Sequence, residues 1–126
     1  MKKLTTLALL LLLFNCVQET QRKAITLKVD MRGIENVDNV SVRGNTTPLS
    51  WEESIVLEDK NNDSIYETTI ELKSASYNIQ FKFVKNENEF ELEGYNNRSI
   101  IFDYKPEKIV YLAKYNDPNP IEVIKK

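Results

Sequence analysis

Residues 25–32 of this chain read ITLKVDMR, and they decide the fold class. Their apolar and polar residues alternate strictly, which is the period-two pattern of a strand with one buried face. Residues 77–84, YNIQFKFV, repeat this alternation and place Lys82 on the outward face. Both segments therefore predict strands that border a common apolar core.

Further strands are expected in five segments that alternate or are rich in β-branched and aromatic residues: 40–42, 65–72, 89–93, 99–102 and 108–114. Turn-forming residues separate them, such as Gly44-Asn45, which both tolerate a positive φ. No window has the 3.6-residue apolar period of a helix. The pattern predicts an all-β, immunoglobulin-like antiparallel β-sandwich of seven to eight strands, with Trp51 in a connecting loop.

The segment 89–93 alternates carboxylates with Phe90 and Leu92. This predicts that Glu91 and its two neighbouring glutamates lie on the solvated face, while Phe90 and Leu92 turn toward the core.

The first fifteen residues have the layout of a secretory signal. Met1-Lys2-Lys3 precede an apolar run over 7–14, which is far shorter than the roughly 20 residues of a membrane span. Cys16 follows, where a bacterial lipoprotein signal places its lipid-accepting residue; the alternative is a cysteine discarded with an ordinary signal. We expect a signal peptide at 1–15 and an exported lipoprotein held through Cys16, in the bacterial outer membrane.

The rest of the chain is long enough for one domain. Polar residues 16–23 predict a tether, and residues 24–116 the sandwich. Residues 117–126 are expected to be an irregular tail, because Asp117-Pro118-Asn119-Pro120 resists regular structure.

Composition argues against several classes of function. The 17 basic and 19 acidic residues are intermixed, so no basic stripe can neutralise a nucleic acid. The chain has no histidine, which removes the usual general base and the commonest transition-metal ligand. A carboxylate pair that hydrolyses glycosides needs a deep cleft, which so small a sandwich seldom forms. We expect no enzyme, no cofactor and no nucleic-acid partner.

The spacing Asp59-x-Asn61-x-Asp63 invites comparison with a calcium loop. The loop lacks the required glycine, and Ile70 stands where the loop needs a bidentate glutamate. A polar turn is the favoured interpretation, and no metal is expected.

Four short motifs occur in a fixed order: Val42-Arg43-Gly44-Asn45, Leu49-Ser50-Trp51, Phe81-Lys82-Phe83 and Glu93-Gly94-Tyr95-Asn96-Asn97-Arg98. In this order the chain resembles the family 20 carbohydrate-binding modules, the starch-binding domains, over about residues 25–116. The resemblance implies shallow, non-catalytic binding of α-1,4-glucans. It also shows one departure, because Leu92 stands where the family has a second stacking tryptophan.

The resemblance implies that Trp51 stacks on a sugar, that Lys82 and Asn97 bind hydroxyls, and that Tyr66 belongs to a second site. Each residue also has a structural interpretation. Trp51 could pack over the sandwich edge, Lys82 could be merely solvated, Tyr66 could belong to the core, and Asn97 with Arg98 could form a turn whose guanidinium binds backbone carbonyls.

The sequence therefore predicts a lipid-anchored module that binds starch or a related α-glucan polysaccharide or oligosaccharide. The alternative is an envelope structural or protein-interaction sandwich, with an envelope protein as its partner, that has lost sugar binding.

Overall fold

The computed structural model describes residues 19–126, so the predicted signal peptide and Cys16 lie outside the described residues. The described part contains nine strands: β1 (Gln21–Asp30), β2 (Val40–Gly44), β3 (Ile55–Leu57), β4 (Ile65–Ser74), β5 (Asn78–Lys85), β6 (Glu89–Phe90), β7 (Arg98–Ile101), β8 (Glu107–Lys114) and β9 (Pro120–Lys125). Over residues 19–126, no helix has the length and apolarity that a membrane span requires.

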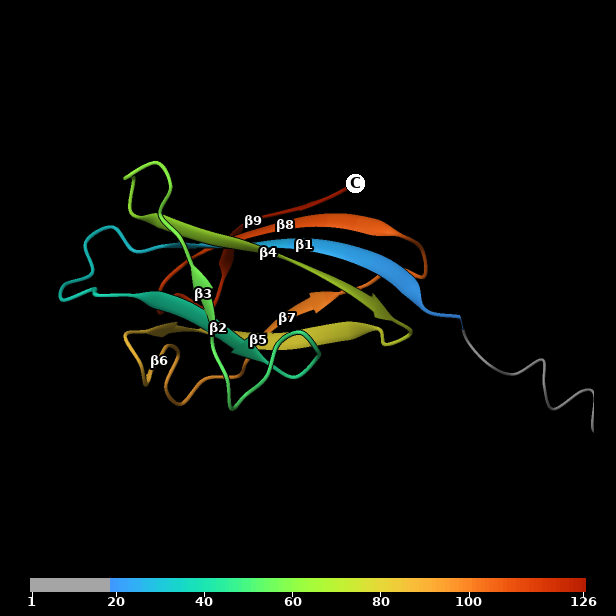
Figure 1. Cartoon of the computed structure of the whole chain (residues 1–126), viewed down its shortest axis with the longest axis horizontal. Helices are drawn as coiled ribbons and strands as arrows, with labels where there is room; N and C mark the ends of the chain where they lie inside the picture. The colour runs from blue at the N-terminus through green and yellow to red at the C-terminus, as the bar shows by residue number, and fades with distance from the viewer. Residues whose placement is uncertain (1–18) are drawn as a thin grey trace, which may run out of the picture.

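The strands form two sheets that face each other (Figure 1). One sheet has the order β4-β1-β8-β9; the other has the order β3-β2-β5-β6, with β7 also paired to β5. The predicted all-β sandwich is confirmed, with two differences in detail. The short β3 and the terminal β9 raise the number of strands to nine, and β1 runs parallel to β8 while the other paired strands are antiparallel.

The core lies between the sheets and takes every second residue of the long strands, as the alternation predicted. Ile25 and Leu27 on β1 are fully buried, as is Phe81 on β5. The Phe81 ring meets the Tyr111 ring edge to face, with 5.1 Å between their centroids. The described residues share one contiguous core, as expected of a single domain.

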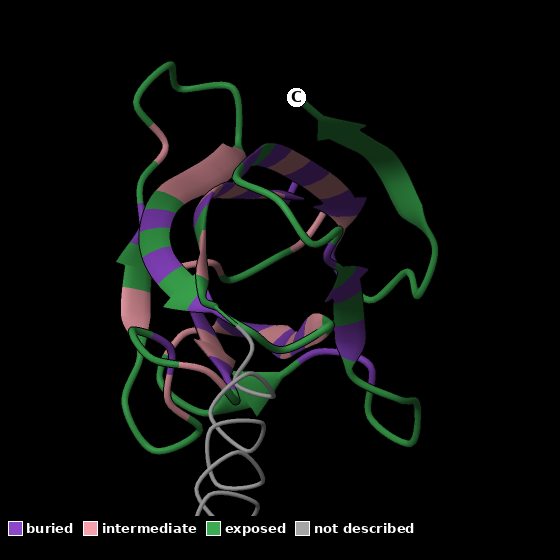
Figure 2. Ribbon diagram, turned by 90° about the vertical axis from the view of Figure 1, so that its right-hand side faces the viewer, coloured by how far each residue is buried: buried purple, intermediate pink, exposed green. Residues whose placement is uncertain are grey.

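Both predicted ends of the domain need correction. The tether was expected to include 16–23, but β1 begins at Gln21, and Lys23 is buried with its ammonium bound to Glu107 and two backbone carbonyls. The tail was expected to be irregular, but its last residues form β9, which pairs with β8 and is exposed along its whole length (Figure 2). Pro120 opens that strand on the sheet edge, a position that tolerates proline.

The prediction for residues 89–93 was correct for Leu92, which is buried, and wrong for Glu91 and Phe90. Glu91 is fully buried, whereas Phe90 is 38% exposed. Strand β6 has only two residues, and Leu92 adopts a φ of 55°, so the alternation does not continue through this segment. Glu91 turns inward because it forms an ion pair with buried Arg98.

Candidate functional site

The outer face of the five-stranded sheet carries most of the residues that the sequence singled out. On β5, Phe81 and Phe83 point into the core, so Gln80 and Lys82 point outward. Arg43 of β2 lies directly opposite Lys82 in the antiparallel register. This face is therefore polar along its centre, where two neighbouring strands present cationic side chains.

Trp51 lies beside this face in the loop between β2 and β3. Its side chain is partly accessible, since the residue is 36% exposed. Arg43 fixes the loop, because its Nη1 donates to the Trp51 carbonyl at 3.2 Å and its Nε donates to Ser54 Oγ at 2.8 Å. The Trp51 backbone is thereby held next to the outward side chains of β2. The alternative, that Trp51 packs over the sandwich edge, accounts for only part of its surface.

The start of this loop is fixed by Gly44 and Asn45. A side chain at Gly44 would meet the Gln80 carbonyl at 2.6 Å, so glycine is needed for close approach of β2 to β5. Asn45 Oδ1 accepts from the Gln80 amide at 2.9 Å, while the Asn45 amide donates to the Gln80 carbonyl at 3.0 Å. The sequence predicted this turn because both residues tolerate a positive φ, but neither Gly44 nor Asn45 adopts one.

A hollow of about 340 Å³ lies over β2, next to the Trp51 loop. Its lining combines amides, hydroxyls, one cation, one carboxylate and one apolar side chain: Asn39, Ser41, Arg43, Ser54, Val56, Asn86, Glu87 and Asn88. These groups donate and accept hydrogen bonds, and the one lining carboxylate, Glu87, is matched in charge by Arg43, which suits a neutral ligand rich in hydroxyls. Arg43 joins the hollow to Trp51, since it lines the first and binds the carbonyl of the second.

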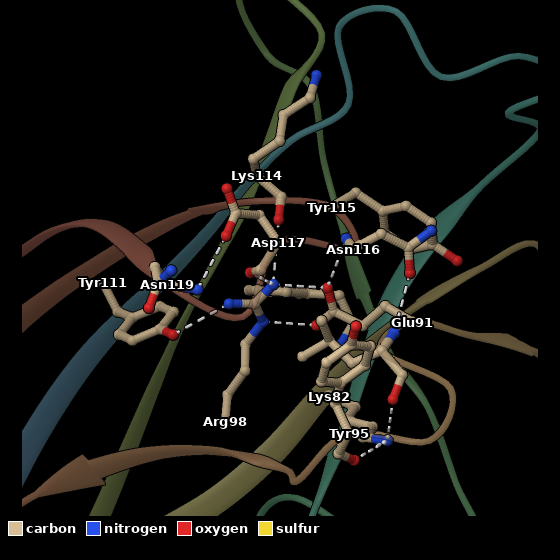
Figure 3. Close-up of polar contacts among 12 residues, drawn as sticks. Lys82, Glu91, Tyr95, Arg98, Tyr111, Lys114, Tyr115, Asn116, Asp117 and Asn119 are labelled. Atoms are coloured by element: carbon tan, nitrogen blue, oxygen red, sulfur yellow. Dashed lines mark hydrogen bonds and ion pairs between the residues drawn. The ribbon is translucent and has the colours of Figure 1, made fainter.

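Lys82 is not simply solvated. Its Nζ donates to the carbonyl of Leu92 at 3.1 Å and to that of Tyr95 at 3.3 Å (Figure 3). An ammonium has three donors, so these two bonds leave one for a ligand. Lys82 therefore joins the centre of β5 to the loop over residues 92–97.

Asn97 belongs to the same loop and the same outer face. Its Nδ2 donates to Gln80 Oε1 at 3.2 Å, which places it two residues along β5 from Lys82. The structure thus brings Lys82 and Asn97 together on the five-stranded sheet, and Trp51 joins them through Arg43.

Arg98 anchors this loop from beneath, as the structural interpretation of the sequence predicted. Its guanidinium donates to both carboxylate oxygens of Glu91, at 2.6 and 2.7 Å. It also donates to the carbonyls of Lys114 and Asp117, at 3.0 and 2.7 Å (Figure 3). Both side chains of the ion pair are fully buried. One guanidinium therefore ties β7 to the residue that follows β6, to the end of β8 and to the β8–β9 connection.

Electrostatics keep the cation charged in this buried place. Burial acts to lower the pKa of Arg98, but the hydrogen bonds and charge of Glu91 outweigh it, and the pKa is raised. Burial also raises the pKa of Tyr111, whose hydroxyl accepts from Arg98 at 3.2 Å. Burial raises the pKa of Tyr115 to about 12, and its hydroxyl donates to the Glu89 carbonyl at 2.8 Å. Both phenols stay neutral at physiological pH.

Tyr66 lies apart from these residues. It is on β4 of the other sheet, half-buried and packed against the core, which agrees with the core interpretation. The acidic turn also has a structural use: Asp59 accepts from the amides of Asp63 and Ser64, and Asp63 accepts from the Ile65 amide. These carboxylates accept hydrogen bonds from backbone amides of their own turn, as expected of a polar turn.

Two residues of the site were not predicted as site residues. Arg43 alternates with buried Val42, so its outward position could have been inferred from the strand pattern. Tyr95 is 66% exposed in the loop that Lys82 holds, and it lies three residues beyond Leu92. It offers an accessible aromatic ring in the loop where the buried Leu92 cannot stack.

No protein-family model and no curated protein matches this chain. Among solved structures, the chain is similar to the solution structure of CBM25-2 of the β/α-amylase from Paenibacillus polymyxa, with 11% sequence identity and a TM-score of 0.45. The match covers 84% of this chain and 94% of that chain. A likeness this distant assigns neither a family nor a ligand, so any function must be argued from the residues themselves.

Proposed function

We propose that this protein is a non-catalytic module that binds an α-glucan, starch or a related glucan, on the outer face of its five-stranded sheet. The observation that carries the proposal is a partly accessible Trp51 whose backbone Arg43 holds next to a hollow of about 340 Å³ lined by hydrogen-bonding groups. An indole supplies an apolar platform for the C–H face of a glucose ring, and the hollow supplies hydrogen-bonding groups for its hydroxyls.

The roles of the other residues follow from their bonds. Lys82 has one donor left for a hydroxyl, and it also fixes the loop that presents Tyr95 and Asn97. Loss of one stacking platform removes about 1 to 3 kcal/mol, so a site with Trp51 as its main platform binds weakly. The non-enzymatic assignment is supported by the shallow surface and by a sequence without histidine.

Affinity electrophoresis tests this proposal. Wild-type residues 17–126 should migrate more slowly through a gel that contains amylopectin than through a plain gel. Trp51→Ala should remove most of the retardation, and Trp51→Phe should keep part of it. Tyr77→Ala is the matched control, because Tyr77 is also an exposed aromatic residue, at 73%, but lies outside the hollow. Wild-type mobility that amylopectin leaves unchanged would refute glucan binding.

A protein-interaction module is the second candidate. The edge strand β9 exposes Ile121, Val123 and Ile124 at 57, 43 and 37%. An exposed apolar edge can add a strand from a partner. Under this alternative, an envelope protein binds β9, Trp51→Ala leaves its binding unchanged, and charged substitutions at Val123 and Ile124 abolish it.

The proposal includes export and attachment of the protein to the bacterial outer membrane through lipidated Cys16. The charged start, the short apolar run and the position of Cys16 support it. Incorporation of labelled palmitate in bacterial cells, lost in Cys16→Ser, is the expected result. Equal labelling of both variants would contradict lipidation at Cys16.

A further inference from the structure

One end of the sandwich concentrates exposed basic and aromatic side chains. Strand β1 begins there, β4 ends there, and the turn into β5 follows, at the right-hand side of Figure 1. We call this surface the basic end and define it by six exposed residues: Arg22, Lys73, Tyr77, Tyr104, Lys108 and Lys126.

The four cations of the basic end come together by strand pairing. Arg22 of β1 lies opposite Lys73 of β4, and the backbones of Lys108 and Lys126 exchange two hydrogen bonds. Ala24 lies between the two pairs, since it is opposite Lys108 on one side and Glu71 on the other. Its methyl group is much shorter than the surrounding side chains, and it lines a groove of about 750 Å³ with them.

The groove has an excess of positive charge. Four lining cations face one exposed carboxylate, that of Glu71, while the other lining pair, Lys23 and Glu107, neutralise each other in a 2.6 Å ion pair. Over residues 19–126, none of the four cations of the basic end forms an ion pair. They are therefore available to an anionic partner.

Two exposed tyrosines lie at the same end of the sandwich as the groove. Tyr77 and Tyr104 are 73 and 61% exposed and flank a hollow of about 420 Å³, which also includes Gln21, Ser74 and Asp103, whose carboxylate lies 3.7 Å from Lys125 Nζ. Gln21 and Ser74 are one register step from Arg22 and Lys73, so this hollow is at the same end of the strands, on the other face of the sheet from the groove. Rings with a polar tip beside a cluster of Lys and Arg are the combination that favours the headgroup layer of a membrane.

The chain leaves the domain at this same end. The Glu19 amide donates to the Tyr104 hydroxyl at 2.9 Å, so residue 19 lies beside Tyr104. Cys16 is three residues earlier in the sequence, and three residues reach at most about 11 Å even when fully extended. A lipid on Cys16 would therefore bring the basic end close to the headgroups, a distance comparable to the Debye length of about 8 Å in physiological salt.

Hydrogen bonds fix the backbone around Tyr104. Lys23 Nζ donates to the carbonyls of Asp103 and Lys105, each at 2.6 Å, and thereby fixes the backbone on both sides of Tyr104. The Asp103 amide donates to Glu107 at 2.8 Å. A preformed surface loses little conformational entropy when it docks.

We propose that the basic end docks on the anionic phospholipid headgroups of the membrane that holds lipidated Cys16, with a phosphate group in the groove over Ala24. This inference rests on the lipid anchor proposed above. It makes the module a docked domain with a fixed orientation, and the five-stranded sheet with its hollow remains free to meet a glucan.

Vesicle sedimentation tests the docking without the anchor. Residues 17–126 should bind vesicles of phosphatidylcholine with phosphatidylglycerol and should not bind phosphatidylcholine alone. Lys73→Gln/Lys108→Gln should weaken binding about 20- to 30-fold, since each cation near an anionic surface contributes about fivefold. The matched control is Lys28→Gln/Lys60→Gln, which makes the same charge change away from the basic end and should change binding less than about twofold. Circular dichroism of each variant checks that the sandwich is intact.

Three results would overturn the proposal: no binding to the anionic vesicles, equal binding to neutral vesicles, or equal losses in the two double variants. Binding of an acidic polysaccharide at the groove without vesicle binding would also overturn it, and would assign the groove to a glycan. The glucan proposal is judged separately, because Lys73→Gln/Lys108→Gln should keep the mobility shift in amylopectin and Trp51→Ala should keep vesicle binding.

Discussion

Replacement of Arg98 by alanine should be among the most damaging single changes in this protein. The substitution removes five hydrogen bonds, including both to Glu91, and leaves a fully buried carboxylate without its cation. Breaking a buried ion pair in this way costs about 3 to 5 kcal/mol. A domain of this size is stable by only about 5 to 15 kcal/mol, so the substitution removes between about one fifth and all of that margin.

Urea unfolding followed by circular dichroism measures this cost. With a slope typical of a small domain, the midpoint should fall by roughly 2 to 4 M. The double variant Glu91→Leu/Arg98→Met, which removes both charges, should lose less than Arg98→Ala, because no buried charge is left unpaired. Arg22→Ala is the control, since Arg22 is exposed without an ion pair among the described residues, and should change stability by less than about 0.5 kcal/mol. A loss below about 1 kcal/mol for Arg98→Ala would refute the structural role assigned to the pair.

Three further changes test other parts of the structure. Gly44→Ala should lower the free energy of unfolding by about 1 to 3 kcal/mol and weaken glucan binding, because the alanine methyl group would meet the Gln80 carbonyl and displace the Trp51 loop. Urea unfolding measures the first effect and gel mobility in amylopectin the second. Tyr95→Ala should weaken retardation in amylopectin without changing the unfolding midpoint, and an unchanged mobility would remove Tyr95 from the site. Lowering the pH from 7 to 3 should reduce the free energy of unfolding below about pH 4.5, and this free energy should fall less steeply with pH in Glu107→Gln. If the variant's free energy falls as steeply as that of the wild type, Glu107 does not contribute to the pH dependence.

The sign of the pH effect follows from two carboxyl groups. The Arg32 hydrogen bond lowers the pKa of Asp30 from its ordinary 3.8, despite opposition from burial. Burial acts to raise the pKa of Glu107, but hydrogen bonds from Lys23 and the Asp103 amide prevail and lower it from 4.5. A carboxyl group whose pKa is lower in the folded state stabilises the fold above its unfolded pKa, and this contribution disappears as the pH falls through the folded pKa.

Strict alternation made the fold predictable from residues 25–32 and 77–84, because a sheet with one buried face imposes a period of two on side chains. Strand β3 turns Leu57 into the core but has only three residues, too few to show the period, and β9 is exposed along its whole length. Strand β9 is defined by its pairing with β8 across the sheet edge, which local sequence does not encode. The parallel pairing of β1 with β8 likewise depends on contacts between distant segments.

The candidate site was predictable in part for the same reason. The alternation placed Lys82 outward, and the turn before Trp51 indicated an accessible loop. The inward position of Glu91 was missed, because charged residues are seldom buried unless they are paired, and its partner Arg98 lies beyond a loop. The bonds from Lys82 to the carbonyls of Leu92 and Tyr95 also depend on how that loop folds back over β5.

Trp51 is the one tryptophan of the chain, so its fluorescence reports directly on the proposed sugar platform. Titration of the wild-type domain with maltoheptaose should change the intensity and the emission maximum along a saturable curve. We expect a dissociation constant in the millimolar range, which corresponds to about 4 kcal/mol of binding free energy for the whole site. The Tyr77→Ala control should give the same curve. An emission spectrum that maltoheptaose leaves unchanged at saturating concentration would contradict glucan binding through Trp51.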